Sequence, residues 1–138
     1  MKKLDHIAIF VDNLDAGIAF YRKLLGGEPI IAPVPELGIT CAFFAAEGSP
    51  AIELVTFSGA GELGHGDVVV AIEVDDLDTA LAEYRANGLK VYDQPATENL
   101  PFRRGWITKA DGHGTIIELC EKGQIPAFIE SHRALART

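Results

Sequence analysis

The chain has little of what several protein classes require. Its 138 residues include two cysteines, Cys41 and Cys120, which lie in apolar runs without CxxC spacing. This pattern indicates neither a disulfide framework nor a cysteine zinc cluster. The longest apolar runs, 41–46 and 68–72, are far shorter than the ~20 residues that span a bilayer. We therefore expect reduced core cysteines in a cytoplasmic protein that has no membrane segment.

Basic residues are also scarce. Twelve Lys and Arg stand against twenty Asp and Glu, which gives a formal net charge of −8. Such a balance argues against nucleic acid and against an anionic membrane surface as partners. No glycine-rich strand-to-helix turn and no nucleophile elbow occurs, so neither a nucleotide fingerprint nor a serine hydrolase is indicated. A small-molecule substrate remains as the expected partner.

What the chain does have is an internal repeat. At an offset of 63, residues 6–22 lie over residues 69–85 with nine of 17 positions identical. At an offset of 65, AIELVTF (51–57) lies over IIELCEK (116–122). The shift of two is what a loop insertion produces, so the chain is an internal duplication.

Each half predicts the same order of elements, βαβββ. Strands of β-branched residues are expected at 3–11 and 68–74, each followed by a helix of about twelve residues with a capping Asp or Asn. Further strands are expected at 28–34, 39–46, 50–57, 89–93, 103–109 and 114–121. We predict one α+β domain over 1–138. It comprises module 1 (3–57), a glycine-rich linker (58–66), module 2 (67–122) and a C-terminal helix (123–138).

The duplication also pairs side chains that could carry chemistry. Glu53 and Glu118 occupy the same mid-strand place in the two halves, each between Ile and Leu. His6 lies in the first strand, and its repeat mate is Val69. One such residue alone is more often a solvent-facing Glu or a structural His. The repeated placement makes us expect that packing of the two halves brings His6, Glu53 and Glu118 together.

Three stretches carry a resemblance to a known family: the opening LDHIAIFVDNLDAGIAFYRKLLGGEP, VAIEVDDLDTALAEYRANGLKV and KADGHGTIIELCEK. With PVPELGITCAFF, they resemble the vicinal oxygen chelate superfamily (glyoxalase I, bleomycin resistance proteins, dioxygenases), most of all its methylmalonyl-CoA epimerase branch. The resemblance implies paired βαβββ modules that form a U-shaped mixed sheet around a divalent metal. It also implies that His6, Glu53, Val69 and Glu118 stand at the ligand positions.

Valine departs from this pattern because it has no lone pair to donate, and metal-using members carry a histidine there. Three ligands still suffice for Co²⁺, Ni²⁺, Mn²⁺ or Zn²⁺ if waters complete the shell. Asp67, two residues before Val69, is an open alternative ligand, whereas His65 and His113 are expected to be loop residues. The alternative is a metal-free, drug-resistance-like binding protein that uses the same cavity. A ring-cleaving dioxygenase is disfavoured, because it needs two histidines.

The resemblance implies a lyase or isomerase that stabilises an enolate of an acyl-thioester or α-oxo substrate, such as a CoA thioester, with Glu118 as the base. The position of a second base falls on Cys41, whose thiol is a poor substitute unless its pKa is lowered. Arg103 and Arg104 could clamp a carboxylate or phosphate of the substrate, or be solvated loop residues. Because related proteins commonly pair, we also expect a homodimer.

Overall fold

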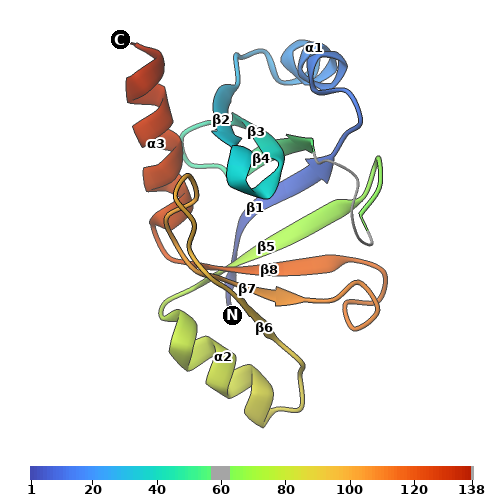
Figure 1. Ribbon diagram of the computed structural model, residues 1–138, viewed down its shortest axis with the longest axis vertical. Coiled ribbons are helices and arrows are strands. Elements are labelled where there is room, and N and C mark those ends of the chain that lie inside the picture. The colour runs from blue at the N-terminus through green and yellow to red at the C-terminus, as the bar shows by residue number, and fades with distance from the viewer. Residues whose placement is uncertain (57–62, 138) are drawn as a thin grey trace.

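The computed structural model describes residues 1–56 and 63–137, so part of the expected linker (58–62), together with Phe57 and Thr138, lies outside the described residues. Figure 1 shows the elements in chain order. The first half contains β1 (Lys3–Phe10), α1 (Leu14–Leu25), β2 (Ile30–Val34), the 3-10 turn η1 (Pro35–Leu37), β3 (Ile39–Phe44) and β4 (Ala51–Thr56). The second contains β5 (Val68–Val74), α2 (Leu77–Ala86), β6 (Tyr92–Gln94), β7 (Arg104–Ile107), β8 (Ile116–Glu121) and then α3 (Gln124–Ala136). The expected βαβββ order is confirmed in both halves.

The strands of both halves form one mixed sheet in the order β2-β3-β4-β1-β5-β8-β7-β6. The pairs β1–β4 and β5–β8 are parallel, while β1 and β5 meet antiparallel at the centre. The sheet curls into a trough, which confirms the predicted U shape (Figure 1).

The register at the centre of the sheet shows the repeat as an approximate twofold symmetry. His6 is opposite Ala71, and Ala8, the mate of Ala71, is opposite Val69. On the outer sides of this pair, Glu53 is the neighbour of Ala8 and Glu118 is the neighbour of Ala71. His6 and Val69 thus occupy equivalent places, as do the two glutamates.

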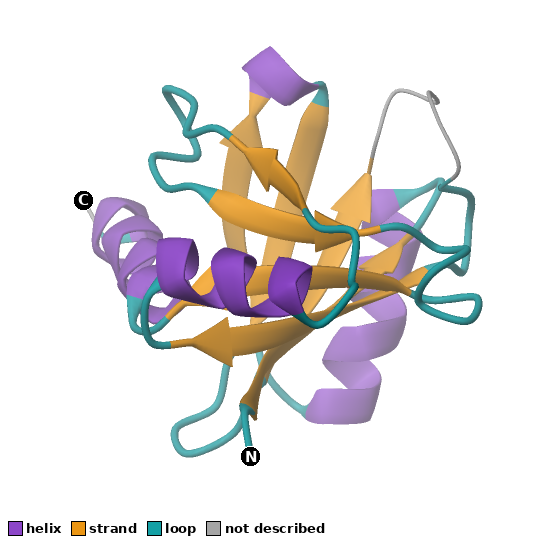
Figure 2. Cartoon of the chain, turned by 90° about the horizontal axis from the view of Figure 1, so that it is seen from below, coloured by secondary structure: helices purple, strands orange, loops and turns teal. Residues whose placement is uncertain are grey.

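Helices α1 and α2 cover the outer, convex face, and capping residues fix where each begins. The side chain of Asn13 accepts a hydrogen bond from Ala16 N at 3.0 Å, and Asp76 accepts one from Thr79 N at 2.9 Å. Figure 2 shows α2 lying across the outside of the strands. Apolar side chains fill the layer beneath each helix. They are Val11, Ala42, Phe44 and Leu54 under α1, and Val74, Leu77, Ala80, Leu81, Val91, Ile107 and Leu119 at α2.

The C-terminal helix lies instead on the concave side. Ile125, Phe128 and Ile129 are buried there, and the Phe128 ring meets Phe43 and Phe102 edge to face at centroid distances of 6.0 Å and 5.6 Å. Because aromatic pairs in this geometry add to the energy of apolar burial, α3 is anchored firmly at one end of the trough. The remaining part of the trough is left for a cavity. No helix in the described part of the chain is both long and apolar enough to cross a membrane.

Candidate active site

Three polar side chains meet on the concave face of the sheet. Nε2 of His6 in β1 lies 3.2 Å from Oε1 of Glu53 in β4 and 3.5 Å from Oε2 of Glu118 in β8. The three residues are only 1%, 8% and 4% exposed. Buried charged groups are rare unless they are paired or bind a cation, so this cluster is the foremost candidate for function. The structure brings together the three residues that the duplication singled out.

Asp5 holds the other side of the His6 ring. Neighbouring residues of a regular strand point to opposite faces, but the β1–β5 register shifts between Leu4 and His6, where Asp5 is the extra residue. A bulge of this kind redirects a side chain. Oδ2 of Asp5 accordingly reaches Nδ1 of His6 at 2.6 Å, and its side chain is 3% exposed. Sequence reasoning missed Asp5, because only the bulge allows this contact.

The charges of the cluster depend on one another. Burial lowers the pKa of His6, but hydrogen bonds to Asp5, Glu118 and Glu53 outweigh burial and raise this pKa well above its usual value. Burial raises the pKa of Glu118, whereas hydrogen bonds and positive charge from His6 and Arg104 lower it to about 2. In the protein alone, His6 is therefore positively charged and Glu118 is negatively charged near neutral pH.

Arg104 reaches the cluster from β7. Its Nη1 donates to Oε1 of Glu118 at 3.2 Å, and its guanidinium carbon lies 5.2 Å from the centre of the Trp106 ring. Two-residue spacing places Arg104 and Trp106 on the same face of β7, and Trp106 is directly opposite Glu118 in the sheet. One of the two arginines that were expected near the substrate is thus part of the site.

Glu53, Glu118 and Arg104 line a cavity of 280 Å³ in the trough, and His6 lies behind the two carboxylates. Polar atoms come from Glu53, Glu118, Arg104 and Gln94. The rest of the wall is mostly apolar: Ala8, Phe10, Leu37, Ile39, Val55, Leu63, Val69 and Trp106. The volume lies below the roughly 300–1,000 Å³ of pockets that enclose drug-sized ligands, so the cavity fits a small acyl group.

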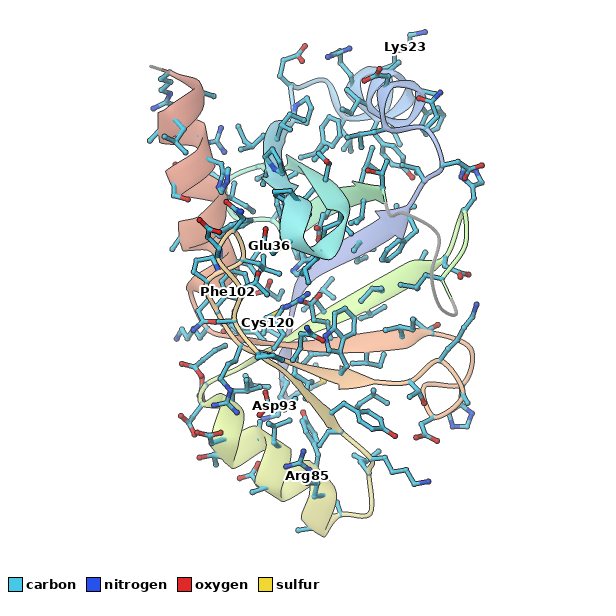
Figure 3. All side chains as sticks on the ribbon, in the orientation of Figure 1. Lys23, Glu36, Arg85, Asp93, Phe102 and Cys120 are labelled. Atoms are coloured by element: carbon cyan, nitrogen blue, oxygen red, sulfur yellow. The ribbon has the colours of Figure 1, made fainter. Side chains whose placement is uncertain are left out.

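Arg103 lies elsewhere. Its Nη2 is 2.6 Å from Oδ2 of Asp93 and 2.9 Å from Oδ1 of Asp78 in α2. Figure 3 labels Asp93 on the α2 side of the sheet. Arg103 immediately precedes β7, and its side chain turns toward these two aspartates instead of entering the trough. The expectation of a substrate clamp therefore passes to Arg104 alone, because Arg103 is engaged with carboxylates outside the cavity.

The two cysteines are buried beside the site as free thiols. Burial, with the negative charge of Glu53 next in importance, raises the pKa of Cys41 well above its usual value. Burial likewise raises the pKa of Cys120, which lies with Asp5 and His6 in a group whose possible ligand atoms are within 4.8 Å of one another. Cys41, the position expected for a second base, does not line the cavity, and its thiol stays protonated near neutral pH.

Asp67 does not replace the missing ligand at Val69. Its carboxylate accepts a hydrogen bond from Gly64 N at 2.8 Å and another from Nζ of Lys109 at 3.1 Å. His65 also lies at the surface, 2.7 Å from the carboxylate of Asp12. These partners keep both residues in the loop region that the sequence predicted for His65.

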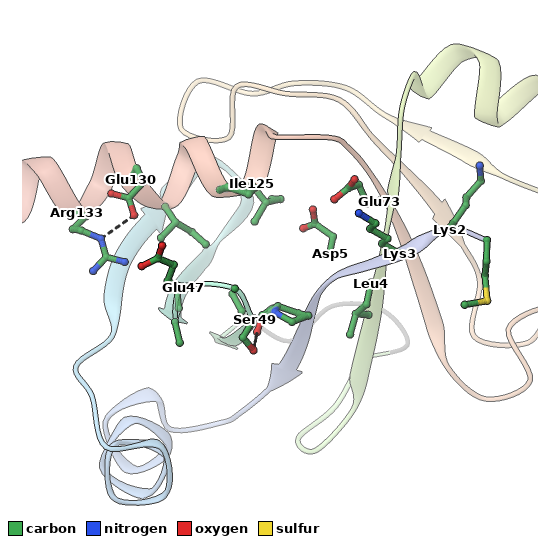
Figure 4. A pocket seen from close by; sticks show the side chains of 18 residues that line it. Lys2, Lys3, Leu4, Asp5, Glu47, Ser49, Glu73, Ile125, Glu130 and Arg133 are labelled. Carbon is green, nitrogen blue, oxygen red and sulfur yellow. Dashed lines mark hydrogen bonds and ion pairs between the residues drawn. The ribbon is translucent and has the colours of Figure 1, made fainter.

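A second, larger pocket of 1080 Å³ lies between the start of β1, the β3–β4 turn and α3. Figure 4 shows the Asp5 side chain between β1 and the start of α3, with Ile125 across from it. Asp5 therefore lines this pocket while its carboxylate holds His6. The pocket wall carries three basic and four acidic side chains but has no convergent set of ligands, so we do not assign it the chemistry.

Known proteins are similar to this chain in sequence and in fold. Methylmalonyl-CoA epimerase, mitochondrial, from Bos taurus is 28% identical over 109 residues, which cover 68% of this chain and 59% of that protein. The Homo sapiens protein of the same name is 27% identical over 101 residues, and the chain covers 55% of its length. The chain thus spans less than two thirds of these two curated relatives.

Solved structures match over more of their length. Methylmalonyl-CoA epimerase from Mycobacterium tuberculosis has a TM-score of 0.71 and 27% identity, covering 90% of this chain and 91% of that one. A variant of the Streptomyces coelicolor epimerase in complex with 2-nitronate-propionyl-CoA has a TM-score of 0.67 and 26% identity, covering 89% and 99%. The family model of the Glyoxalase/Bleomycin resistance protein/Dioxygenase superfamily matches residues 3–117. The chain therefore belongs to this superfamily, the vicinal oxygen chelate proteins, and resembles its methylmalonyl-CoA epimerase branch.

Proposed function

We propose that the protein is a divalent-cation-dependent isomerase that removes and returns the α-proton of a small acyl thioester. One observation carries this proposal. A buried histidine is held at Nδ1 by Asp5, and its Nε2 faces two buried carboxylates in the wall of a small cavity. Such a group of donors is favourable only if positive charge lies among them.

The donors fit a divalent cation. Asp5, Glu53 and Glu118 are three nearly buried carboxylates, and among the described residues Arg104 is the one permanent cation that forms an ion pair with them. In the protein alone, a proton on His6 supplies the second positive charge. One imidazole and two carboxylates suit Co²⁺, Ni²⁺, Mn²⁺ or Zn²⁺, and a carboxylate behind the imidazole is the usual support of a histidine ligand. We therefore assign His6, Glu53 and Glu118 as the ligands, with Val69 leaving one position without a protein donor.

A divalent cation held there would supply Lewis-acid stabilisation of negative charge on the substrate oxygens. The residues of the chain perform the rest of the reaction. Glu118, which lines the cavity as a carboxylate, accepts the α-proton, so the C–H bond breaks and an O–H bond forms on its side chain. The electron pair moves toward the acyl oxygen, and the apolar wall excludes water.

Inversion requires that a proton return to the opposite face of the α-carbon. Cys41 is unsuited to this, because it does not line the cavity and burial raises the pKa of its thiol. Glu53 is the other carboxylate of the cavity and belongs to the opposite half of the chain. We assign the return of the proton to Glu53 in its protonated form: its O–H bond breaks as the new C–H bond forms, while Glu118 keeps the proton it accepted. Exchange with solvent then removes the proton from Glu118 and restores one to Glu53.

The substrate class follows from size and from the relatives. Because a 280 Å³ cavity is too small for a whole coenzyme A thioester, the acyl group would enter it and the nucleotide part would remain outside. Proteins named as epimerases of methylmalonyl-CoA are similar in sequence and fold. This thioester is therefore the first compound to test.

The test is proton exchange. Chelator-treated protein is incubated with methylmalonyl-CoA in D₂O, with and without Co²⁺ or Mn²⁺, and α-deuterium is followed by NMR. We expect exchange that depends on the cation and is lost in Glu118→Gln, whereas Glu121→Gln at the end of the same strand should keep most of it. Absence of exchange in the native protein with every cation, together with absence of Co²⁺ binding by calorimetry, would overturn the proposal.

A further inference from the structure

Arg104 has hydrogen-bonding capacity that the protein does not use. Its side chain is only 11% exposed, although arginine is among the residues least often buried. It lines the cavity beside Gln94 and Trp106. A buried guanidinium is costly unless acceptors meet its N–H groups, so the partners of each nitrogen decide what this residue does.

Neighbouring residues satisfy only one edge of the Arg104 guanidinium. Nη1 donates to Glu118 at 3.2 Å, and one face of the group lies near the Trp106 ring. Nε is fully buried and finds no acceptor among the residues that the structure describes. The Nε–Nη2 edge, the one away from the Glu118 contact, is a planar fork whose shape matches a carboxylate.

The surroundings also indicate a small anionic group. Gln94 lies directly opposite Arg104 in the β6–β7 pair and lines the same cavity, where its amide can donate a further hydrogen bond. Leu37, Ile39 and Val55 form an apolar wall.

We propose that Arg104, with Gln94, binds a carboxylate of the substrate through its Nε–Nη2 edge. Arg104 thereby restricts the cavity to small acids, or to acyl groups that carry a free carboxylate. That this ligand is the substrate rests on the proposed function, but the binding of a carboxylate does not. The guanidinium is then a specificity-determining group: on one side it donates a hydrogen bond to Glu118, and on the other it binds the carboxylate of the substrate.

The chain provides its own reporter for the test. Trp106 is its only tryptophan, and the guanidinium lies beside its ring. Chelator-treated protein is titrated with malonate and, as the neutral comparison, with malonamide, by Trp106 fluorescence and by calorimetry. We expect saturable binding of malonate and none of malonamide.

Neighbouring arginines give a matched pair of variants. Arg104→Gln should weaken malonate binding by about 10-fold or more, since charge-assisted hydrogen bonds are lost. Arg103→Gln removes a surface arginine and should leave binding unchanged. Arg104→Lys keeps the charge without the fork and should fall between. If Arg104→Gln melts at a much lower temperature, the lysine variant and Gln94→Leu, which should weaken binding by a smaller factor, decide.

The outcomes separate this inference from the proposed function. Malonate binding that requires Arg104, without cation-dependent proton exchange, supports carboxylate binding by Arg104 and counts against the isomerase. If proton exchange occurs and its KM for methylmalonyl-CoA is equal in the native protein and in Arg104→Gln, only the proposed carboxylate binding by Arg104 is overturned. Absence of saturable malonate binding by the native protein, or equal affinity in Arg104→Gln, also overturns it.

Discussion

Asp5 and His6 are adjacent in the sequence, yet their side chains are hydrogen-bonded at 2.6 Å, because β1 carries one extra residue opposite β5. This contact fixes which ring nitrogen faces Glu53 and Glu118. A carboxylate behind a histidine ligand orients the ring and makes it a better donor. The bulge is therefore as much a part of the candidate site as the histidine itself.

The first prediction concerns that support. Asp5→Asn keeps the shape but removes the charge behind the ring, so affinity for Co²⁺ should fall by about 10- to 100-fold. Calorimetric titration near pH 7.5 measures the change, and Asp75→Asn, an exposed aspartate of the second module, is the control. Equal affinity in Asp5→Asn and the native protein would show that Asp5 has no role in cation binding.

The second prediction concerns the ligands. Glu118→Gln should lower Co²⁺ affinity strongly, because an amide has no negative charge. Val69→His places an imidazole at the position equivalent to His6, so it should tighten Co²⁺ binding by roughly 10-fold or more. Calorimetry compares both variants with the native protein. Weaker binding in Val69→His would mean that Val69 does not face the cation.

The third prediction concerns pH. Burial lowers the pKa of His6 in the folded protein, but hydrogen bonds to Asp5, Glu118 and Glu53 outweigh it and raise this pKa well above its usual value. The folded state therefore binds a proton that the unfolded state loses near pH 6.5, and the stabilisation is complete below that pH. Without cation, the free energy of unfolding should fall as pH rises above ~6.5, by up to about 1.4 kcal/mol per pH unit.

Urea unfolding at several pH values with chelator present measures this slope. His6→Gln should remove it, while His65→Gln, a surface histidine beside Asp12, should retain it. A native protein whose stability is constant or increases between pH 6.5 and 8.5 would contradict the assignment of the charge to His6.

The fourth prediction concerns the homodimer. On α1, Phe20 and Leu24 are exposed, whereas their repeat mates are polar: Glu83 on α2 and Asn87, which caps the end of α2. The same place in two copies of one unit is thus apolar in one copy only, which is typical of a covered surface. Phe20→Glu with Leu24→Asn should halve the molar mass measured by light scattering, while Leu89→Asn should not. A native protein that is monomeric at micromolar concentration refutes the dimer.

Much of the fold could be predicted because the internal duplication presents the same pattern of elements in both halves of the chain. The repeat aligned Glu53 with Glu118 and placed both in strands, so one face had to receive both side chains. The contact of Asp5 with His6 could not be predicted, because a bulge depends on the register between strands. For the same reason the sequence could not tell whether Arg103 or Arg104 enters the trough, although the place of Trp106 opposite Glu118 decides it. The docking of α3 depends on aromatic packing between distant segments.

The twofold register of the sheet has a consequence for stereochemistry. Cys41 pairs with Val55 as Arg104 pairs with Cys120, and Val55 and Cys120 are themselves repeat mates. Each of the two walls of the trough thus has a glutamate at the same position, Glu53 in one and Glu118 in the other. The other equivalent positions differ: one wall has His6 and Cys41 where the other has Val69 and Arg104. Two identical subunits could not build such a cavity, since any change would appear on both walls. Because both modules lie in one chain, the side chains of each wall could change separately. A molecule bound between the two walls therefore meets different groups on its two faces, so the cavity can distinguish one face from the other.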